Sequence, residues 1–479
     1  MTQPVRPPPP HWTALVFQLL PFADAASVDL PLPRLLRLAL FQVSVGMAMV
    51  LLNGTLNRVM VVELGTPTWL VALLIAVPLF AAPFRALIGH KSDTHRSVLG
   101  WRRVPYIWFG TLMQFGGLAI MPFALLLLGT TDRFEIGLVA ATAAFLLTGV
   151  GFHVTQTAGL ALATDLAPED KRPRAVALLY VMLLVGMMFA AFVIGGVLSD
   201  YSETKLVQVI QGCALLTVIL NVIALWKQEA RNPSVTAPDR ETATFREIWQ
   251  AFITDGRNAR LLTAIGIGAA GFAMQDALLE PYGGEILGLS VGATTGLTGA
   301  WALGSLFGFM LSGRALARGW DPLRLAGAGL VIGINAFLLV LFAGPFGAPL
   351  MLYAGALTIG VGLGLFSVGT LMEAMSLAKH QTAGLALGAW GAVQATCAGF
   401  GIAIGGLLRD GIAALLQSGD QTASIAMRAT GYGTVYILEI ALLLIGLAAI
   451  GPLVSHQRRL PDDAEDPLAQ PFGLVEFPT

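Results

Sequence analysis

The stretch FVIGGVLSD at residues 192–200 returns as IAIGGLLRD at residues 402–410, which is 210 residues later. Both copies carry paired glycines between apolar residues and end in an aspartate. A second pair supports the repeat, because residues 151–167 can be laid on residues 362–378 at nearly the same spacing, each beginning with a glycine-rich segment and containing Leu-Ala near its end. The sequence therefore predicts that the chain arose by duplication and has two related halves.

The composition around these stretches is that of a membrane protein. Of 479 residues, 56% are hydrophobic and 12% are charged, and the mean hydropathy is +0.74. Soluble proteins have roughly 45–50% apolar and about 25% charged residues, so an ordinary water-soluble enzyme is excluded. The 28 basic and 29 acidic residues nearly cancel, which leaves no overall field to gather nucleic acid. We expect lipids around the chain and no nucleic-acid partner.

Twelve windows of mostly apolar residues are long enough to cross a membrane. A helix needs about 20 residues to span a hydrocarbon core of about 30 Å with its backbone groups paired. The predicted spans are residues 36–62, 67–88, 103–128, 135–163, 174–199, 206–226, 260–280, 290–316, 323–343, 347–374, 383–408 and 429–454. The sequence predicts an all-α integral membrane protein with six transmembrane helices in each half.

Basic residues are distributed unevenly over the connections between the spans. When both tails and every second connection are assigned to the cytoplasm, the other side keeps only Arg133, Lys205, Arg409 and Arg428. Such a bias sets orientation in the membrane, so both termini are expected in the cytoplasm.

The chain is expected to divide into five segments. These are a cytoplasmic or interfacial N-terminal segment (residues 1–34), a first six-helix half (35–227), a cytoplasmic connecting loop (228–259), a second half (260–455) and a cytoplasmic tail (456–479). Residues 11–32 are apolar but broken by prolines. They fit an anchor at the lipid headgroups or a docking element for another membrane protein.

Parallel repeats of six helices are the plan of the major facilitator superfamily. The loop GHKSDTHRSVLGWRR, residues 89–103, also resembles that superfamily's loop of glycine, aspartate and paired basic residues. By this resemblance Gly89 permits a close helix approach, Asp93 caps and pairs, and Arg102 and Arg103 form the basic end. Thr94 stands where a basic residue is usual, and extra residues separate the aspartate from the arginines. A positive-inside loop without any conformational role explains the same charges.

Span seven contains two carboxylates on one helix face. Asp276 and Glu280 are four residues apart in GFAMQDALLEPYGGEILGLS, residues 271–290. A charge in hydrocarbon costs at least about 2.5–3.5 kcal/mol, and Pro281 and the following glycines allow the irregular backbone found beside cavities. One interpretation is a proton- or cation-coupling site. In the other, only Asp276 is deep and is held by Gln275 or a neighbouring arginine.

Arg58 and Glu439 are further charges inside predicted spans. Arg58 in span one either pairs with an acidic residue of another helix or extends to the outer interface with Glu63. Glu439 in the last span has Tyr436 as its nearest polar neighbour in sequence and is expected to bond another helix rather than face lipid.

His153 lies well inside span four, in GVGFHVTQTAGLALATD, residues 149–165. Its imidazole is a possible axial ligand for the magnesium of a tetrapyrrole, with small glycines leaving room for a flat macrocycle and Phe152 stacking nearby. Gln156 is a possible hydrogen-bond partner of that ligand, or it bonds across helices. The alternative is a hydrogen-bonded packing histidine.

Three common enzyme motifs are absent from the sequence: it has no phosphate loop, no paired Cys-x-x-Cys and no His-Glu-x-x-His. We expect the protein not to be an enzyme.

Three segments together resemble the PucC/LhaA family, the bacteriochlorophyll delivery branch of the major facilitator superfamily in purple phototrophic bacteria. They are LPFADAASVDLPLPRLLRLALFQVSVGMAMVLLNGTLNRVMVVEL from residue 20, APFRALIGHKSDTHRSVLGWRRVPYIWFGTLMQFGGLAIMPFALLLL from residue 82, and MQDALLEPYGGEILGLSVGATT from residue 274. The similarity extends from about residue 15 to residue 455.

The resemblance implies an assembly factor, or chaperone, for bacterial light-harvesting antenna complexes in the intracytoplasmic photosynthetic membrane. Its implied partners are the light-harvesting alpha and beta polypeptides, with the reaction-centre core or pigment-synthesis enzymes as further ones. Bacteriochlorophyll is the implied cofactor, and His153, Phe152, Gln156, Asp276 and Glu280 are the candidate pigment-binding residues. The resemblance does not distinguish whether the protein helps to assemble the core antenna ring or the peripheral one. The alternative function is a proton-coupled secondary transporter or flippase that uses Asp276, Glu280 or Glu439.

Overall fold

The computed structural model describes residues 25–27, 30–85, 88, 92, 101–168, 171–229, 256–376, 383–416 and 425–457, and every regular element in these ranges is a helix. The first half contains α2 (Leu32–Met49), η2 (Val50–Leu56), η3 (Val59–Glu63), α3 (Thr68–Phe80), α5 (Val104–Leu128), η4 (Thr131–Arg133), α6 (Phe134–Leu166), α7 (Arg172–Val197) and α8 (Glu203–Leu225). The second half contains α10 (Gly256–Ala273), η7 (Met274–Ala277), α11 (Leu279–Glu285), α12 (Val291–Ala317), α13 (Pro322–Ala343), α14 (Pro349–Ser376), α15 (Ala383–Leu416) and α16 (Ile425–Gln457).

The prediction of an all-α membrane protein is confirmed. Within the described ranges, each of the twelve predicted spans coincides with one helix or with consecutive helices, and ten of these are long and apolar enough to cross a membrane. The other two are α3, which has 13 residues, and α12, whose 27 residues are rich in glycine and hydroxyl side chains.

Span two is interrupted before the end that hydropathy predicts. The expected span reached residue 88, whereas α3 ends at Phe80 and a turn follows at residues 81–83, before helical residues return at 84, 85 and 88. Pro78 inside the helix and Pro83 just after it explain the difference, because each lacks the N–H that would continue the helical hydrogen bonds. The predicted limits of spans eleven and twelve are too short instead, since α15 continues to Leu416 and α16 begins at Ile425.

Span one changes from an α-helix to wider π-helical turns along η2 and η3. The π segments follow Met49 and form the C-terminal part of the span, and Asn57 and Arg58 lie at the junction between them. Hydropathy cannot signal such turns, which occur frequently at functional sites.

Span seven is interrupted where the sequence places its carboxylates. The α-helix α10 gives way to the 3₁₀ turn η7 before α11 continues. Pro281 is the cause, because its missing N–H would have bonded the carbonyl of Ala277 and its ring crowds that carbonyl. The expected irregular backbone therefore lies one turn before the proline and contains Asp276.

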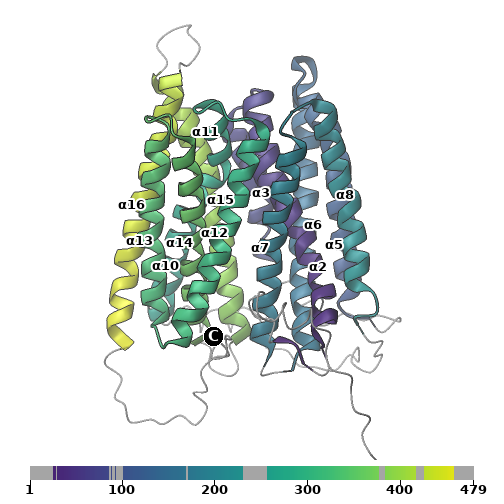
Figure 1. Ribbon diagram of the computed structural model, residues 1–479, viewed down its shortest axis with the longest axis vertical. Helices are drawn as coiled ribbons and strands as arrows, with labels where there is room; N and C mark the ends of the chain where they lie inside the picture. Colours follow the sequence, from purple (N-terminus) through teal and green to yellow (C-terminus); the bar gives the residue numbers. More distant parts are fainter. Residues whose placement is uncertain are drawn as a thin grey trace, which may run out of the picture.

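Each half has its own apolar core. One large cluster is built mainly from α2, η2, α3, α5, α6 and α7, and another mainly from α10, α11, α13, α14 and α16. The halves meet along two seams, where α7 packs on α12 and α15 packs on α3 (Figure 1).

The repeated glycine stretches lie in these two seams. A Cβ on Gly195 of α7 would be 2.9 Å from the carbonyl oxygen of Gly292 in α12, and one on Gly406 of α15 would be 3.0 Å from the carbonyl oxygen of Thr68 in α3. Side chains larger than hydrogen would separate the helices there. The duplicated motif thus builds the contact between the halves twice.

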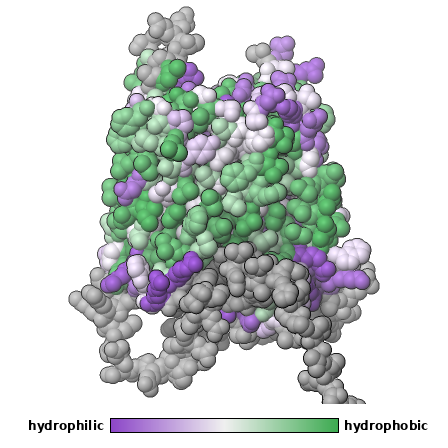
Figure 2. All heavy atoms as spheres, in the orientation of Figure 1, coloured by the Kyte–Doolittle hydropathy of each residue, from purple (hydrophilic) through white to green (hydrophobic). Residues whose placement is uncertain are grey.

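The first residues of α2 and the last residues of α16 lie at the same, lower end of the bundle in Figure 1, while α11 lies near the opposite end. Figure 2 shows a mostly apolar surface between these two ends. We call the end with α11 the outer end and the other the basic end. The chain is a multi-pass membrane protein, and the cytoplasmic location of its termini stays a prediction.

Neighbouring glycines provide a matched test of the seam. We predict that Gly195→Ala destabilises the folded protein by about 1–3 kcal/mol, because the new methyl group meets backbone in α12. Gly196→Ala is the control, since a Cβ there meets no atom within 4 Å. Thermal unfolding in detergent, followed by tryptophan fluorescence, measures both variants. Equal stability of the two would contradict the seam.

Candidate functional site between the halves

Polar side chains bridge the two halves in the interior of the bundle. Thr55 of η2 lies 3.1 Å, hydroxyl to hydroxyl, from Thr295 of α12. The Asn57 amide donates to the backbone carbonyl of Asp276, with a distance of 3.2 Å. Because all of these groups except the Asp276 side chain are buried, the bonds hold the centre of the bundle together rather than lining an open channel.

The two carboxylates of span seven have different partners. Asp276 accepts a hydrogen bond from the neighbouring Gln275 amide, as one interpretation of the sequence expected, but the same interpretation was wrong that only Asp276 is deep, because Glu280 is the more buried of the two. Glu280 is 3% exposed, accepts from the Thr298 hydroxyl of α12, and lies against Gly54, where a Cβ would meet its carboxylate. The π-helical turn and its glycine therefore make the space that Glu280 occupies.

Glu439 of α16 is fully buried and does not face lipid. Its carboxylate interacts with the backbone N–H of Gln275 in span seven, so its polar contact is to another helix, as expected. Neither carboxylate oxygen has a partner at full hydrogen-bond geometry among the described residues. The Tyr436 hydroxyl, one turn away on the same helix, is likewise buried without a partner in that set.

Arg58 pairs with Glu63, as one of the two alternatives expected, and makes no ion pair with an acidic residue of another helix among the described residues. Its guanidinium pairs with Glu63 of its own span and also donates to the carbonyl of Leu289 in the second half, with a distance of 3.1 Å. The residue is 5% exposed, so it acts as a bridge between the halves rather than extending into solvent.

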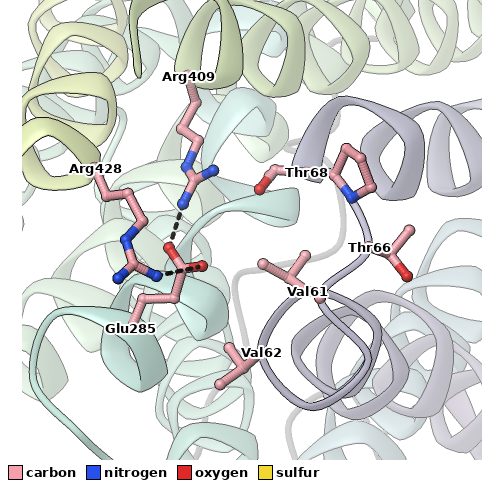
Figure 3. A pocket seen from close by; sticks show the side chains of 9 residues that line it. Val61, Val62, Thr66, Thr68, Glu285, Arg409 and Arg428 are labelled. Carbon is pink, nitrogen blue, oxygen red and sulfur yellow. Dashed lines mark hydrogen bonds and ion pairs between the residues drawn. The ribbon is translucent and has the colours of Figure 1, made fainter. Parts of the chain in front are cut away.

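A polar cavity of about 320 Å³ lies at the outer end between the halves. Val61, Val62, Gly65, Thr66, Pro67 and Thr68 line one side, and Glu285, Arg409 and Arg428 line the other (Figure 3). Glu285 accepts bonds from Arg409 and from the Tyr432 hydroxyl, the latter at 3.0 Å, and lies 3.7 Å from Arg428.

Arg409 was not among the predicted site residues, although the repeat contains a signal for it. The two copies of the repeated stretch differ at the residue before the aspartate, which is Ser199 in the first and Arg409 in the second.

The aspartates that end the two copies also make different contacts. Asp410 accepts from the backbone N–H of Trp69 at 2.7 Å and so caps α3 of the other half. Asp200 bonds Lys205 instead, which lowers the pKa of its carboxyl.

His153 faces the interior of the first half. It is 6% exposed, its ring lies 4.5 Å from that of Phe152, and both ring nitrogens lack a hydrogen-bond partner among the described residues. It borders a cavity of only about 40 Å³ between α2, η2, α3 and α6. Gln156 bonds Arg85 at 2.9 Å and Gln42 at 3.3 Å, so it does not orient the histidine.

A charged cluster joins four segments at the basic end. Arg102 and Arg103 both bond Asp165 at the end of α6, at 2.6 and 2.9 Å, and Arg103 also bonds Ser92. The Glu229 carboxylate accepts from the backbone N–H groups of Arg102, Arg103 and Val104. The predicted loop residues Gly89 and Asp93 lie outside the described residues.

Glu229 was missed by sequence analysis because it follows α8 and is far in sequence from the helix that it caps. Residue 103 precedes α5 and supplies no side-chain cap of its own. A carboxylate at a helix N-terminus satisfies unpaired N–H groups and matches the positive end of the helix dipole. This carboxylate therefore ties the start of the predicted connecting loop to span three.

Among the described residues, no group of three or more histidine, cysteine, aspartate or glutamate side chains could hold a metal ion. The buried carboxylates instead favour binding of protons, and the arginines of the outer cavity favour binding of oxygen acceptors.

We predict that Glu229→Ala destabilises the protein by about 1–2 kcal/mol, because three backbone donors at the start of α5 lose their acceptor. The control is Glu203→Ala, which removes an exposed carboxylate from the first turn of α8. Chemical or thermal unfolding in detergent gives the difference. A loss no larger than that of the control would exclude capping by Glu229.

Solved structures with similar folds are membrane transporters. The nucleoside transporter NupG aligns with a TM-score of 0.63 and 14% identity, covering 87% of this chain and 99% of that chain. A bacterial homolog of the human lysosomal transporter Spinster, in an inward-facing and unoccupied conformation, aligns with a TM-score of 0.62 and 16% identity over 87% of this chain and 95% of the other. These likenesses confirm the major facilitator fold.

Sequence relatives are much closer. An uncharacterized protein in the puhA-bchM intergenic region of Rhodobacter capsulatus is 52% identical over 97% of this chain and 98% of its own length. Protein PucC of Rhodovulum sulfidophilum is 55% identical over 82% of this chain and 89% of its own. The bacteriochlorophyll synthase 44.5 kDa chain of Rhodobacter capsulatus is 28% identical over 86% and 93%. Residues 55–458 match the PUCC protein family, and the chain belongs to that family.

Proposed function

We propose that this protein is a non-catalytic assembly factor for the light-harvesting antenna complexes of a purple phototrophic bacterium. The observation that carries the proposal is membership of the PUCC family, with identities of about 50% to proteins named PucC over more than four fifths of the chain. The proposed location is the intracytoplasmic photosynthetic membrane, with both termini in the cytoplasm.

The packing between the halves favours clients on the outside of the bundle. Bonds from Thr55, Asn57 and Arg58 cross the centre and the outer end. Large apolar side chains face outward instead, among them Phe109, Phe123, Phe189, Phe192, Leu215, Phe307, Phe342 and Phe400. The surface between the two ends in Figure 2 is correspondingly apolar. Lipid-facing surface of this kind suits single-span antenna polypeptides, which are proposed as the clients, with the reaction-centre core and pigment-synthesis enzymes as further partners.

Bacteriochlorophyll does not fit at His153 in this packing. A bound pigment would supply a magnesium that accepts an axial nitrogen, and the histidine has an unpartnered nitrogen to offer. The adjoining cavity of about 40 Å³ has room for water, whereas sites for drug-sized ligands begin at about 300 Å³. Ligation by His153 therefore requires α3 and α6 to separate, and we propose that any pigment is held with its antenna polypeptide on the flank.

Purification in mild detergent from antenna-forming cells tests the assembly role. We predict that small antenna polypeptides and near-infrared absorbance of bacteriochlorophyll co-purify with the protein. Mass spectrometry of the small polypeptides and the absorbance spectrum measure this, and a preparation from cells that lack the antenna genes is the control. Protein that carries neither component under assembling conditions would count against the proposal.

The buried carboxylates support a second candidate, a proton-coupled transporter or flippase. Glu280 and Glu439 are almost fully buried, and Asp276 lies near them in span seven. Protons bind carboxylates in such surroundings readily, and many membrane transporters use intramembrane acids in this way.

Neutralising the carboxylates separates the two candidates. We predict that the double variant Asp276→Asn, Glu280→Gln keeps antenna absorbance within about twofold of wild type, because glutamine can still accept from Thr298 and the flank is unchanged. Membrane absorbance spectra at equal protein level measure the outcome, with exposed Asp132→Asn as the control. Loss of antenna absorbance together with loss of proton uptake in vesicles would favour transport.

A further inference from the structure

The outer cavity has the dimensions of a small-ligand site. Its volume of about 320 Å³ is at the lower end of the range of about 300–1,000 Å³ typical of ligand pockets. It differs from the apolar flanks because arginine and threonine side chains line it. Neither the antenna role nor the transport alternative uses it.

Hydrogen-bond donors around this cavity lack acceptors. The Nε groups of Arg409 and Arg428 are buried without a partner among the described residues, and so is the Thr68 hydroxyl. Thr68 is 1% exposed, and in Figure 3 its hydroxyl points across the gap toward the arginine side. Buried donors without acceptors cost about 1–3 kcal/mol each, so a ligand that offers oxygen atoms would stabilise this arrangement.

The free donors around the cavity, rather than a net charge, favour an anionic oxygen group. Two arginines and one glutamate line the cavity, and Asp410 pairs with Arg409 beside it, so the cluster is formally neutral while two guanidinium Nε groups stay without acceptors. Thr68 is also the first residue of the 13-residue helix α3, whose N-terminal end is capped by Asp410 of the other half, so its hydroxyl is the donor that this helix adds to the cavity.

The cavity is not a by-product of the repeated scaffold. Both copies of the duplicated stretch carry paired glycines and an aspartate, but only the second copy has an arginine, where the first has Ser199. Arg409 is 7% exposed, although a buried arginine is costly without a specific role. Its bonds to Glu285 and Asp410 hold the guanidinium in place and leave Nε available.

We propose that the outer cavity binds the anionic oxygen group of a small ligand, a phosphate or carboxylate group, with Arg409, Arg428 and Thr68 as donors. A phosphodiester of a lipid headgroup and a free anion share this chemistry. The inference does not rest on the antenna role, and its test uses no antenna component.

The test compares the purified full-length chain with two variants of the cavity. Arg428→Gln removes a partly exposed positive charge, and Thr68→Val removes a hydroxyl while keeping the side-chain volume nearly constant. Arg133→Gln is the matched control, because it removes an exposed positive charge between spans three and four, outside the cavity. Thermal unfolding without ligand verifies that each variant is folded.

Ligand binding is measured in two arms. Native mass spectrometry with added phosphatidylglycerol detects a bound lipid, and the shift of Tm with inorganic phosphate or acetate detects a free anion. We expect wild type and Arg133→Gln to bind in at least one arm, and each cavity variant to bind about tenfold more weakly in that arm. The arm that responds identifies the source of the anionic group. No binding to wild type in either arm, or equal binding by folded cavity variants, would overturn the proposal.

Discussion

Close backbone contact between the halves is the constraint on which the rest of the structure depends. Lipid gives helices no hydrophobic reason to associate, so their contacts rely on van der Waals packing and on hydrogen bonds. The repeated glycine stretch provides the first of these, because Gly195 and Gly406 let α7 approach α12 and α15 approach α3. The bonds from Thr55 and Asn57 provide the second. Every site between the halves exists only at the helix separation that these seams set.

Irregular helix turns make polar side chains tolerable inside that contact. The π-helical turns of span one and the 3₁₀ turn of span seven face each other across the halves, and Asn57 bonds a carbonyl in the 3₁₀ turn. Glu280 then fits against Gly54 and bonds Thr298. An unbroken α-helix in either span would place these groups differently. These two departures from regular structure therefore fit together. Pro281 accounts for the one in span seven, whereas hydropathy gives no signal for the π-helical turns of span one.

The sequence predicts well whatever depends on one helix or on short spacing. Hydropathy locates the spans, the repeat indicates the two halves, and neighbouring residues predict the Asp276–Gln275 and Arg58–Glu63 bonds. It fails where contacts come from distant segments. Glu229 caps a helix more than 120 residues earlier, as the separation of 125 to its bonding partner Val104 shows. The outer cavity likewise combines residues of spans one, two, seven, eleven and twelve, which no local pattern brings together.

The same packing suits the proposed assembly role of a transporter fold. Alternating access requires the bonds between the halves to break and reform in each cycle. Here Arg58 bonds the Leu289 carbonyl, and Asp410 caps α3 of the opposite half, so charged groups fasten the outer end at two separate points. Hydrogen bonds to charged groups are worth about 1.5–3 kcal/mol each, and they act together with the glycine seams. A body held closed by these bonds would present one constant outer surface to its neighbours in the membrane, and the proposed assembly of separate antenna helices needs such a surface.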